Sequence, residues 1–143
     1  MRNIANAVAA IESRTGGKTR LSDPIDSEPW GYDSPNRFTN IGAVITLDIA
    51  PTDALRIFRQ IEIEAGSATH CNSNGQYIDR IIDIDIIAID NLVIETPELT
   101  VPHPKMALRE FVLVPMAQIA PQWVHPVLLL TAQQLLDKIR NLP

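Results

Sequence analysis

The stretch Asp79–Ile87 constrains the fold more than any other part of the chain, because aspartates alternate with isoleucines in it. β-Branched residues are typical of strands, whose successive side chains point to opposite faces. Asp83 and Asp85 therefore leave the same face, with their Cα atoms about 6.5–7 Å apart at a rise of about 3.3 Å per residue. Carboxylates this close repel each other, and a divalent cation such as Mg²⁺ removes that repulsion.

A strand with one solvated face is the alternative interpretation of this pattern. Ile81 and Ile87 share the aspartate face, and two large apolar side chains argue against its full exposure. Arg80 stands where the predicted strand begins and is expected in the loop turn there, where it can reach a phosphate or an acid.

Length, charge and cysteine content limit the class of protein. A chain of 143 residues predicts a single domain over 1–143 with a sizeable core. The formal net charge of −5 argues against nucleic acid and against an anionic membrane surface as partners. No apolar run is long enough to span a membrane. The lone Cys71 cannot form an internal disulfide, which favours a reducing cytoplasm.

Hydrophobic spacing and turn residues predict the order of elements. Helices are expected over residues 2–14, 51–65 and 115–119, after Thr131, and as a single turn over 106–110. Strands are expected over 19–27 with an interruption at Pro24, over 38–48 and over 80–89, with short extended pieces at 92–94 and 99–101. Loops are expected over 28–36 and 67–76, and a turn at 90–91. This order predicts the α+β class, with an antiparallel-rich sheet covered by helices on one face.

Other side chains are weaker candidates for a site. His103 and Arg109 lie six residues apart in a proline-broken segment, and a lone histidine is more often structural than catalytic. The residues Trp30, Phe38, Asn40 and Phe111 are candidates for a flat pocket, since aromatic rings stack on planar heterocycles and an amide pairs with a ring edge. An ordinary core with aromatic anchors is equally compatible with them. The glycine-rich phosphate loops of nucleotide-binding proteins are absent from the sequence.

Several short motifs occur together in one order along the chain. They are Glu28–Gly31, Arg37–Asn40, Ile61–Glu62, Asp79–Ile87, Leu99–Pro104, Arg109–Pro115 and Ile119–Pro121. In combination they resemble the 6-hydroxymethyl-7,8-dihydropterin pyrophosphokinases of folate biosynthesis. The resemblance covers nearly the whole chain. It implies a ferredoxin-like α+β sandwich and a transfer of pyrophosphate from ATP to the pterin hydroxymethyl group, with two Mg²⁺ ions.

The resemblance also implies a role for each matching residue. Asp83 and Asp85 would bind the metals, and Asp85 would help to deprotonate the pterin hydroxyl. The remaining expected ligand contacts divide by substrate: Glu62, Tyr77, Arg80, His103 and Arg109 toward ATP, and Trp30, Phe38, Asn40 and Phe111 toward the pterin. Arg80 and Arg109 are expected to take part in catalysis by holding phosphates, a task that suits arginine.

Two departures from the family pattern matter. The family begins with a strand and a glycine-containing turn ahead of its first helix, whereas Met1 stands here at that helix. The first strand is therefore expected to be missing, as in a reading frame that starts at an internal methionine; the alternative is that another segment or subunit fills its place. The loop over 67–76 also carries no arginine or lysine, although this family usually places arginines there.

These departures leave two alternatives beside an active pyrophosphokinase. The first is an impaired family member that binds pterin or nucleotide without efficient turnover. The second is a plain ferredoxin-like interaction domain, in which the aspartates are merely solvated. Metal binding and the formation of AMP separate these interpretations.

Overall fold

The computed structural model describes residues 2–27, 38–66 and 82–141. The chain divides into two compact units. Unit 1 comprises Met1–Thr19 and Ile45–Ile86, and unit 2 comprises Arg20–Val44 and Ile87–Pro143. The single domain that the sequence predicts over 1–143 stays a prediction.

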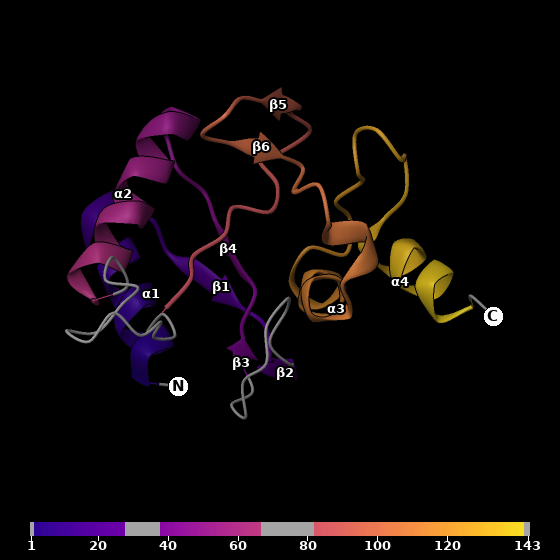
Figure 1. Cartoon of the computed structure of the whole chain (residues 1–143), viewed down its shortest axis with the longest axis horizontal. Helices are drawn as coiled ribbons and strands as arrows, with labels where there is room; N and C mark the ends of the chain where they lie inside the picture. The colour runs from indigo at the N-terminus through magenta and orange to yellow at the C-terminus, as the bar shows by residue number, and fades with distance from the viewer. Residues whose placement is uncertain (1, 28–37, 67–81, 142–143) are drawn as a thin grey trace, which may run out of the picture. The chain divides into compact units, whose positions relative to one another are not determined.

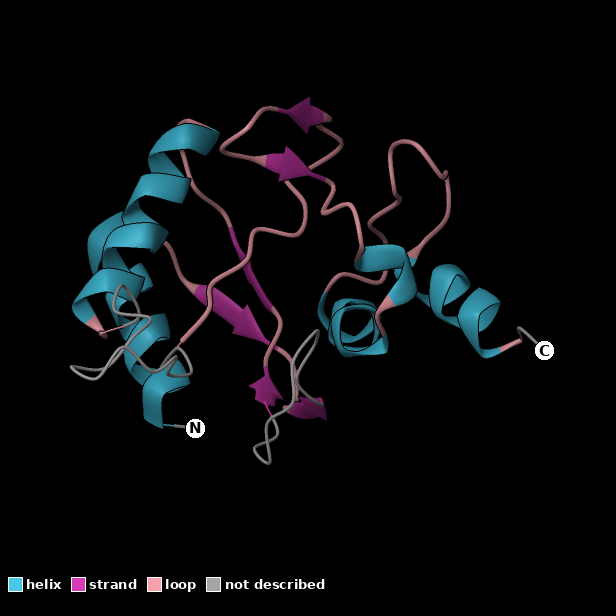
Figure 2. Cartoon of the chain, in the orientation of Figure 1, coloured by secondary structure: helices cyan, strands magenta, loops and turns pink. Residues whose placement is uncertain are grey.

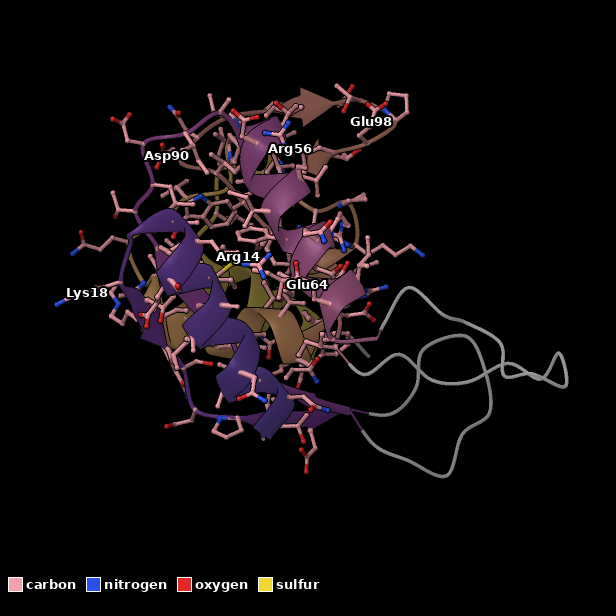
Figure 3. All side chains as sticks on the ribbon, turned by 90° about the vertical axis from the view of Figure 1, so that its left-hand side faces the viewer. Arg14, Lys18, Arg56, Glu64, Asp90 and Glu98 are labelled. Carbon is pink, nitrogen blue, oxygen red and sulfur yellow. The ribbon has the colours of Figure 1, made fainter. Side chains whose placement is uncertain are left out.

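Unit 1 is built on two helices of equal length, α1 (Arg2–Thr15) and α2 (Pro51–Glu64), which pack side by side (Figure 1). Their contact buries the apolar residues that recur at helical spacing, namely Ala7, Ile11, Ala54, Phe58 and Ile61. At the surface, Arg14 of α1 and Glu64 of α2 point toward each other and form an ion pair (Figure 3). The sequence predicted both helices and the glycines that end them. In the structure, Gly16 and Gly66 lie just beyond the helix ends, with positive φ angles of 77° and 94°.

Unit 2 holds short antiparallel strands and the C-terminal helices. Strand β2 (Ile25–Ser27) pairs with β3 (Phe38–Asn40), and β5 (Ile94–Glu95) pairs with β6 (Thr100–Val101). A further pair joins β1 (Thr19–Leu21) to β4 (Ala43–Ile45). After a 3₁₀ turn (η1, Met106–Leu108), helix α3 (Glu110–Ile119) packs against α4 (Ala132–Arg140). Figure 2 shows these helices and short strands, which agree with the predicted α+β class.

The core of unit 2 lies between η1, α3 and α4. Met106, Leu113 and Ala132 are completely buried there, together with Leu135 and Leu136. The side chain of Thr131 begins α4 by accepting a hydrogen bond from the Gln134 amide. The sequence predicted this helix, its cap and its inward face.

The strand predicted over 38–48 is wrong as a single element, because β3 ends at Asn40 and β4 begins only at Ala43. Gly42 separates them: its amide donates to the Ser22 side chain at 2.8 Å, while its carbonyl accepts from the Ser22 amide at 2.9 Å. A Cβ atom on Gly42 would lie 2.8 Å from Cβ of Pro115. A side-chain hydrogen bond and close packing on α3 therefore interrupt the ladder.

Helix α3 also differs from its prediction, because it starts at Glu110 rather than at Pro115 and keeps that proline inside. The amides of Val112 and Leu113 both donate to the carbonyl of Arg109, which closes the first turn before the proline is reached. Leu113, Pro115 and Ile119 are buried, so packing offsets the hydrogen bond that proline cannot make.

The strand predicted over 80–89 is not formed in the part that the structure describes. Residues 82–89 carry no strand assignment and run as loop (Figure 2). The backbone of Ile84 bonds instead to side chains of α2, its amide to Glu62 and its carbonyl to Arg59. Side-chain partners replace a neighbouring strand at this point, which a sequence pattern of period two does not reveal.

Candidate active site

The acidic segment of unit 1 keeps the alternation that its sequence predicts. Ile82, Ile84 and Ile86 are partly buried and pack on the core between α1 and α2. Asp83 and Asp85 between them are exposed. Both carboxylates therefore fall on the side of the segment that faces away from the core, as the period of two requires.

Glu62 is the most buried acid of this region, with 5% of its surface exposed. Its Oε2 atom accepts a hydrogen bond from the Ile84 amide at 2.7 Å, and its Oε1 atom accepts one from Arg59 Nη1. Arg59 Nη2 donates in turn to the Ile84 carbonyl at 2.8 Å. A buried carboxylate is costly unless it is paired and hydrogen-bonded, and here both oxygens are.

The two exposed aspartates suit a hard cation such as Mg²⁺. In phosphoryl-transfer sites this ion is held by one or two carboxylates, and substrate phosphates and water complete its coordination. Among the residues that the structure describes, no group of three or more histidine, cysteine or acidic side chains is arranged to hold a metal without such help. The oxygen donors of Asp83 and Asp85 are of the kind that such a cation takes, with water able to fill its other positions.

Arg109 and Phe111 lie together at the start of α3 in unit 2. Arg109 is the N-cap residue with extended backbone angles, φ −122° and ψ 110°. Its guanidinium carbon lies 5.5 Å from the centre of the Phe111 ring, within the range of a cation–π contact. This places a permanent positive charge, partly buried, beside an aromatic face.

His103 is fixed by the backbone around it. Its amide donates to the Ile87 carbonyl at 2.7 Å, and its Nδ1 atom accepts from the Lys105 amide at 3.2 Å. A neutral ring with this acceptor carries its proton on Nε2. His103 lines a pocket of about 250 Å³ within unit 2, together with Glu95, Thr100 and His125.

Asn40 lies at the end of β3, where its side-chain amide donates to the Ile25 carbonyl at 3.2 Å. Phe38 stands two residues earlier on the same strand, opposite Ser27 in the register. Three residues assigned to the site from the sequence, Trp30, Tyr77 and Arg80, lie outside the described residues.

Within unit 1 the structure brings Glu62 to the backbone between Asp83 and Asp85. Within unit 2 it brings Arg109 to Phe111. The sequence did not single out Arg59. Its spacing of three residues from Glu62 on a predicted helix was the available signal, because side chains at i and i+3 are neighbours on a helix surface.

Comparison with known proteins supports one class of enzyme for this arrangement. The chain is 38% identical over 124 residues to a 2-amino-4-hydroxy-6-hydroxymethyldihydropteridine pyrophosphokinase of Porphyromonas gingivalis. The aligned residues make up 86% of this chain and 83% of that protein. An enzyme of the same name from Bacillus subtilis is 35% identical over 104 residues, 73% of this chain and 60% of the relative. Folic acid synthesis protein FOL1 of Dictyostelium discoideum is 35% identical over 139 residues, 97% of this chain and 20% of the relative.

These relatives define the class as pyrophosphokinases, a kind of transferase. Residues 1–121 match the family described as 7,8-dihydro-6-hydroxymethylpterin-pyrophosphokinase. The chain belongs to this family, which confirms the resemblance found in its sequence motifs. No helix in the described ranges is long and apolar enough to cross a membrane.

Proposed function

We propose that this protein transfers pyrophosphate from ATP to 6-hydroxymethyl-7,8-dihydropterin, a step of folate biosynthesis. The observation that carries the proposal is the family match over residues 1–121, which contains the paired aspartates and all the other predicted site residues. The proposed reaction forms a bond between the pterin hydroxymethyl oxygen and the β-phosphorus of ATP. The bond from that phosphorus to the oxygen that bridges it to the α-phosphorus breaks, and AMP leaves. The hydroxyl proton is lost in the same step.

Asp83 and Asp85 are assigned to hold Mg²⁺, two ions being expected from the family resemblance. Their exposure on one side of the segment supports this role. Bound Mg²⁺ would neutralise the charge that develops on the phosphates and lower the pKa of the attacking hydroxyl. Asp85 is further assigned to help remove the hydroxyl proton.

The remaining assignments follow the chemistry of the side chains. His103 and Arg109 hold phosphate oxygens, the first through a single N–H and the second through its forked guanidinium. Phe111 stacks on the pterin ring and Asn40 pairs with its edge. Trp30, Phe38, Tyr77 and Arg80 keep the roles that the sequence resemblance implies, the first two toward the pterin and the others toward ATP.

The finer features of the fold and setting belong to the same proposal. A ferredoxin-like sandwich is the arrangement that the family resemblance implies for these helices and antiparallel strands. The lone Cys71, which excludes an internal disulfide, supports a cytoplasmic location. ATP and the pterin are the expected partners, without nucleic acid or a membrane.

Replacement of either aspartate by asparagine tests the metal assignment. A bound metal contributes several kcal/mol to transition-state stabilisation, so Asp83→Asn and Asp85→Asn should each reduce kcat/KM by at least about 100-fold. The melting temperature should stay the same or rise, because each change removes a repelling charge. The rate of AMP formation at saturating ATP and Mg²⁺ and a thermal denaturation curve measure both effects.

Asp90→Asn is the matched control for these variants. Asp90 is also exposed and follows the same segment, and its φ angle of 47° is one that asparagine adopts readily. Its kcat/KM should equal that of the wild type. A large fall in melting temperature for Asp83→Asn, with activity per folded molecule retained, would show that the aspartates are structural.

A further inference from the structure

Arg59 and Glu62 act together on one residue of the acidic segment. They lie one helical turn apart on α2, and between them they bond both backbone polar groups of Ile84. In an antiparallel sheet, a residue exchanges both of these hydrogen bonds with a partner on the next strand. Here an ion pair of side chains provides the donor and the acceptor instead. This Arg59–Glu62 pair is called the brace below.

The brace fixes the two peptide groups that flank Ile84. The amide held by Glu62 belongs to the peptide group that joins Asp83 to Ile84, and the carbonyl held by Arg59 belongs to the one that joins Ile84 to Asp85. Because a peptide group is planar, a hydrogen bond to each one restricts the direction in which the adjacent aspartate leaves the backbone. The Ile84 side chain adds a third restraint, since it packs on the core of unit 1.

Burial and charge make the brace suitable for this task. Glu62 is buried and rigidly held, whereas the Arg59 side chain is 41% exposed. The positive charge of Arg59 compensates the negative charge of Glu62, so the brace adds no net charge beside two carboxylates that already repel each other. Both oxygens of Glu62 are occupied, one by Arg59 and one by the Ile84 amide.

We propose that Arg59 and Glu62 are positioning residues, which aim the carboxylates of Asp83 and Asp85 at a shared divalent cation without touching that cation. This inference rests on the proposed role of the aspartates as metal ligands. It gives Glu62 a task different from the ATP contact that its family resemblance implies, because the carboxylate is already committed to the backbone of the acidic segment.

The double variant Arg59→Met/Glu62→Met tests the brace. Replacement of a whole ion pair by apolar side chains of similar volume usually preserves folding, whereas removal of one partner leaves a buried charge. Loss of residues that orient metal ligands typically weakens metal affinity about 10- to 100-fold. The Kd of the folded variant for Mn²⁺, measured by electron paramagnetic resonance without nucleotide, should rise by such a factor. The Mg²⁺ concentration that gives half-maximal activity should rise with it, and excess Mg²⁺ should recover part of kcat.

Asp53→Met/Arg56→Met is the matched control. It removes an ion pair of the same spacing from the same helix, but one that is exposed and joins only its own two side chains. Its Mn²⁺ affinity and Mg²⁺ dependence should equal those of the wild type. Arg59→Lys is a second test in case the double variant does not fold, since lysine keeps the charge but cannot donate to Glu62 and Ile84 through a planar fork. It should weaken Mn²⁺ binding to a smaller extent.

The outcomes separate this inference from the proposed function. A folded double variant, or Arg59→Lys, with wild-type Mn²⁺ affinity and Mg²⁺ dependence would overturn the brace while AMP formation by the wild type still supported the reaction. If the double variant binds Mn²⁺ more weakly than the wild type while the wild type forms no AMP, the brace is supported and the reaction is contradicted. Absence of Mn²⁺ binding by the wild type would overturn both the proposed metal site at Asp83 and Asp85 and the brace.

Discussion

His125 is a buried histidine whose ring holds the turn that follows it. Its Nδ1 atom accepts hydrogen bonds from the amides of Val127 and Leu128, at 3.1 and 3.0 Å. The ring also makes an edge contact with Trp123. Burial lowers the pKa of His125 below its ordinary value of 6.5, because the charged ring loses its hydration. Protonation would in addition convert the acceptor Nδ1 into a donor and break both bonds.

The lowered pKa of His125 makes the stability of the protein depend on pH. A histidine whose pKa is lowered in the folded state contributes its full stability above pH 6.5 and loses it as the pH falls below that value, because the unfolded chain takes up the proton first. The non-titrating variant His125→Asn keeps an acceptor oxygen. Its melting temperature relative to that of the wild type should rise as the pH is lowered from about 7.5 to 5.

Thermal denaturation of both proteins across this pH range measures the difference. Glu95 and His103 line the same pocket and are present in both proteins, so their contribution cancels in the comparison. A constant gap between the two melting temperatures at all pH values would show that His125 is not the titrating group.

Single residues also show what a sequence pattern can and cannot predict. The exposure of Asp83 and Asp85 and the partial burial of Ile82, Ile84 and Ile86 follow from a period of two, and the structure has both. The hydrogen bonds of Ile84 to Arg59 and Glu62 were not predicted, because they join positions more than twenty residues apart. Local spacing carries no information about which distant side chain reaches a backbone group.

Helix α4 depends on its N-terminal cap. The Thr131 hydroxyl accepts from the Gln134 amide at 3.2 Å, and the Gln134 side chain accepts from the Thr131 amide at 2.9 Å, which together form a capping box. Thr131→Ala removes the first bond and should lower the free energy of unfolding by about 1 kcal/mol. Denaturant unfolding gives this value.

Thr131→Ser is the matched control, because it keeps the hydroxyl and should stay close to the wild type. Leu135 and Leu136 bury this helix against the core of unit 2, so a loss at the cap is transmitted to the whole unit. Equal stability of the alanine and serine variants would contradict the capping role.

Helices and strands were predicted well where the residues that determine them lie close together in the sequence. The bounds of α1 and α2 were predicted within a residue or two, since periodicity, Pro51, Gly16 and Gly66 all act within the helix or at its ends. The broken strand at Gly42 and the proline inside α3 were missed together. Both sites involve tertiary packing that local spacing does not encode, since Gly42 closely approaches Pro115.

For the molecule as a whole, the short sequence motifs predicted the family, whereas the predicted helices and strands indicated only the α+β class. The family was found from short motifs whose order and spacing matched, and comparison with relatives confirms it. The two compact units have separate cores, one between α1 and α2 and one around Met106, Leu113 and α4. Their division was not predicted, because each unit combines segments that are far apart along the chain.

Pyrophosphate transfer is distinguished from other phosphoryl transfers by the products formed from ATP. The purified protein is incubated with Mg²⁺, 6-hydroxymethyl-7,8-dihydropterin and ATP that carries a label on its β-phosphorus. We expect AMP and labelled pterin diphosphate in equal amounts, with no ADP, and the loss of both products in Asp83→Asn. Formation of ADP with a pterin monophosphate, or no AMP from a folded protein that binds the pterin, would contradict pyrophosphate transfer.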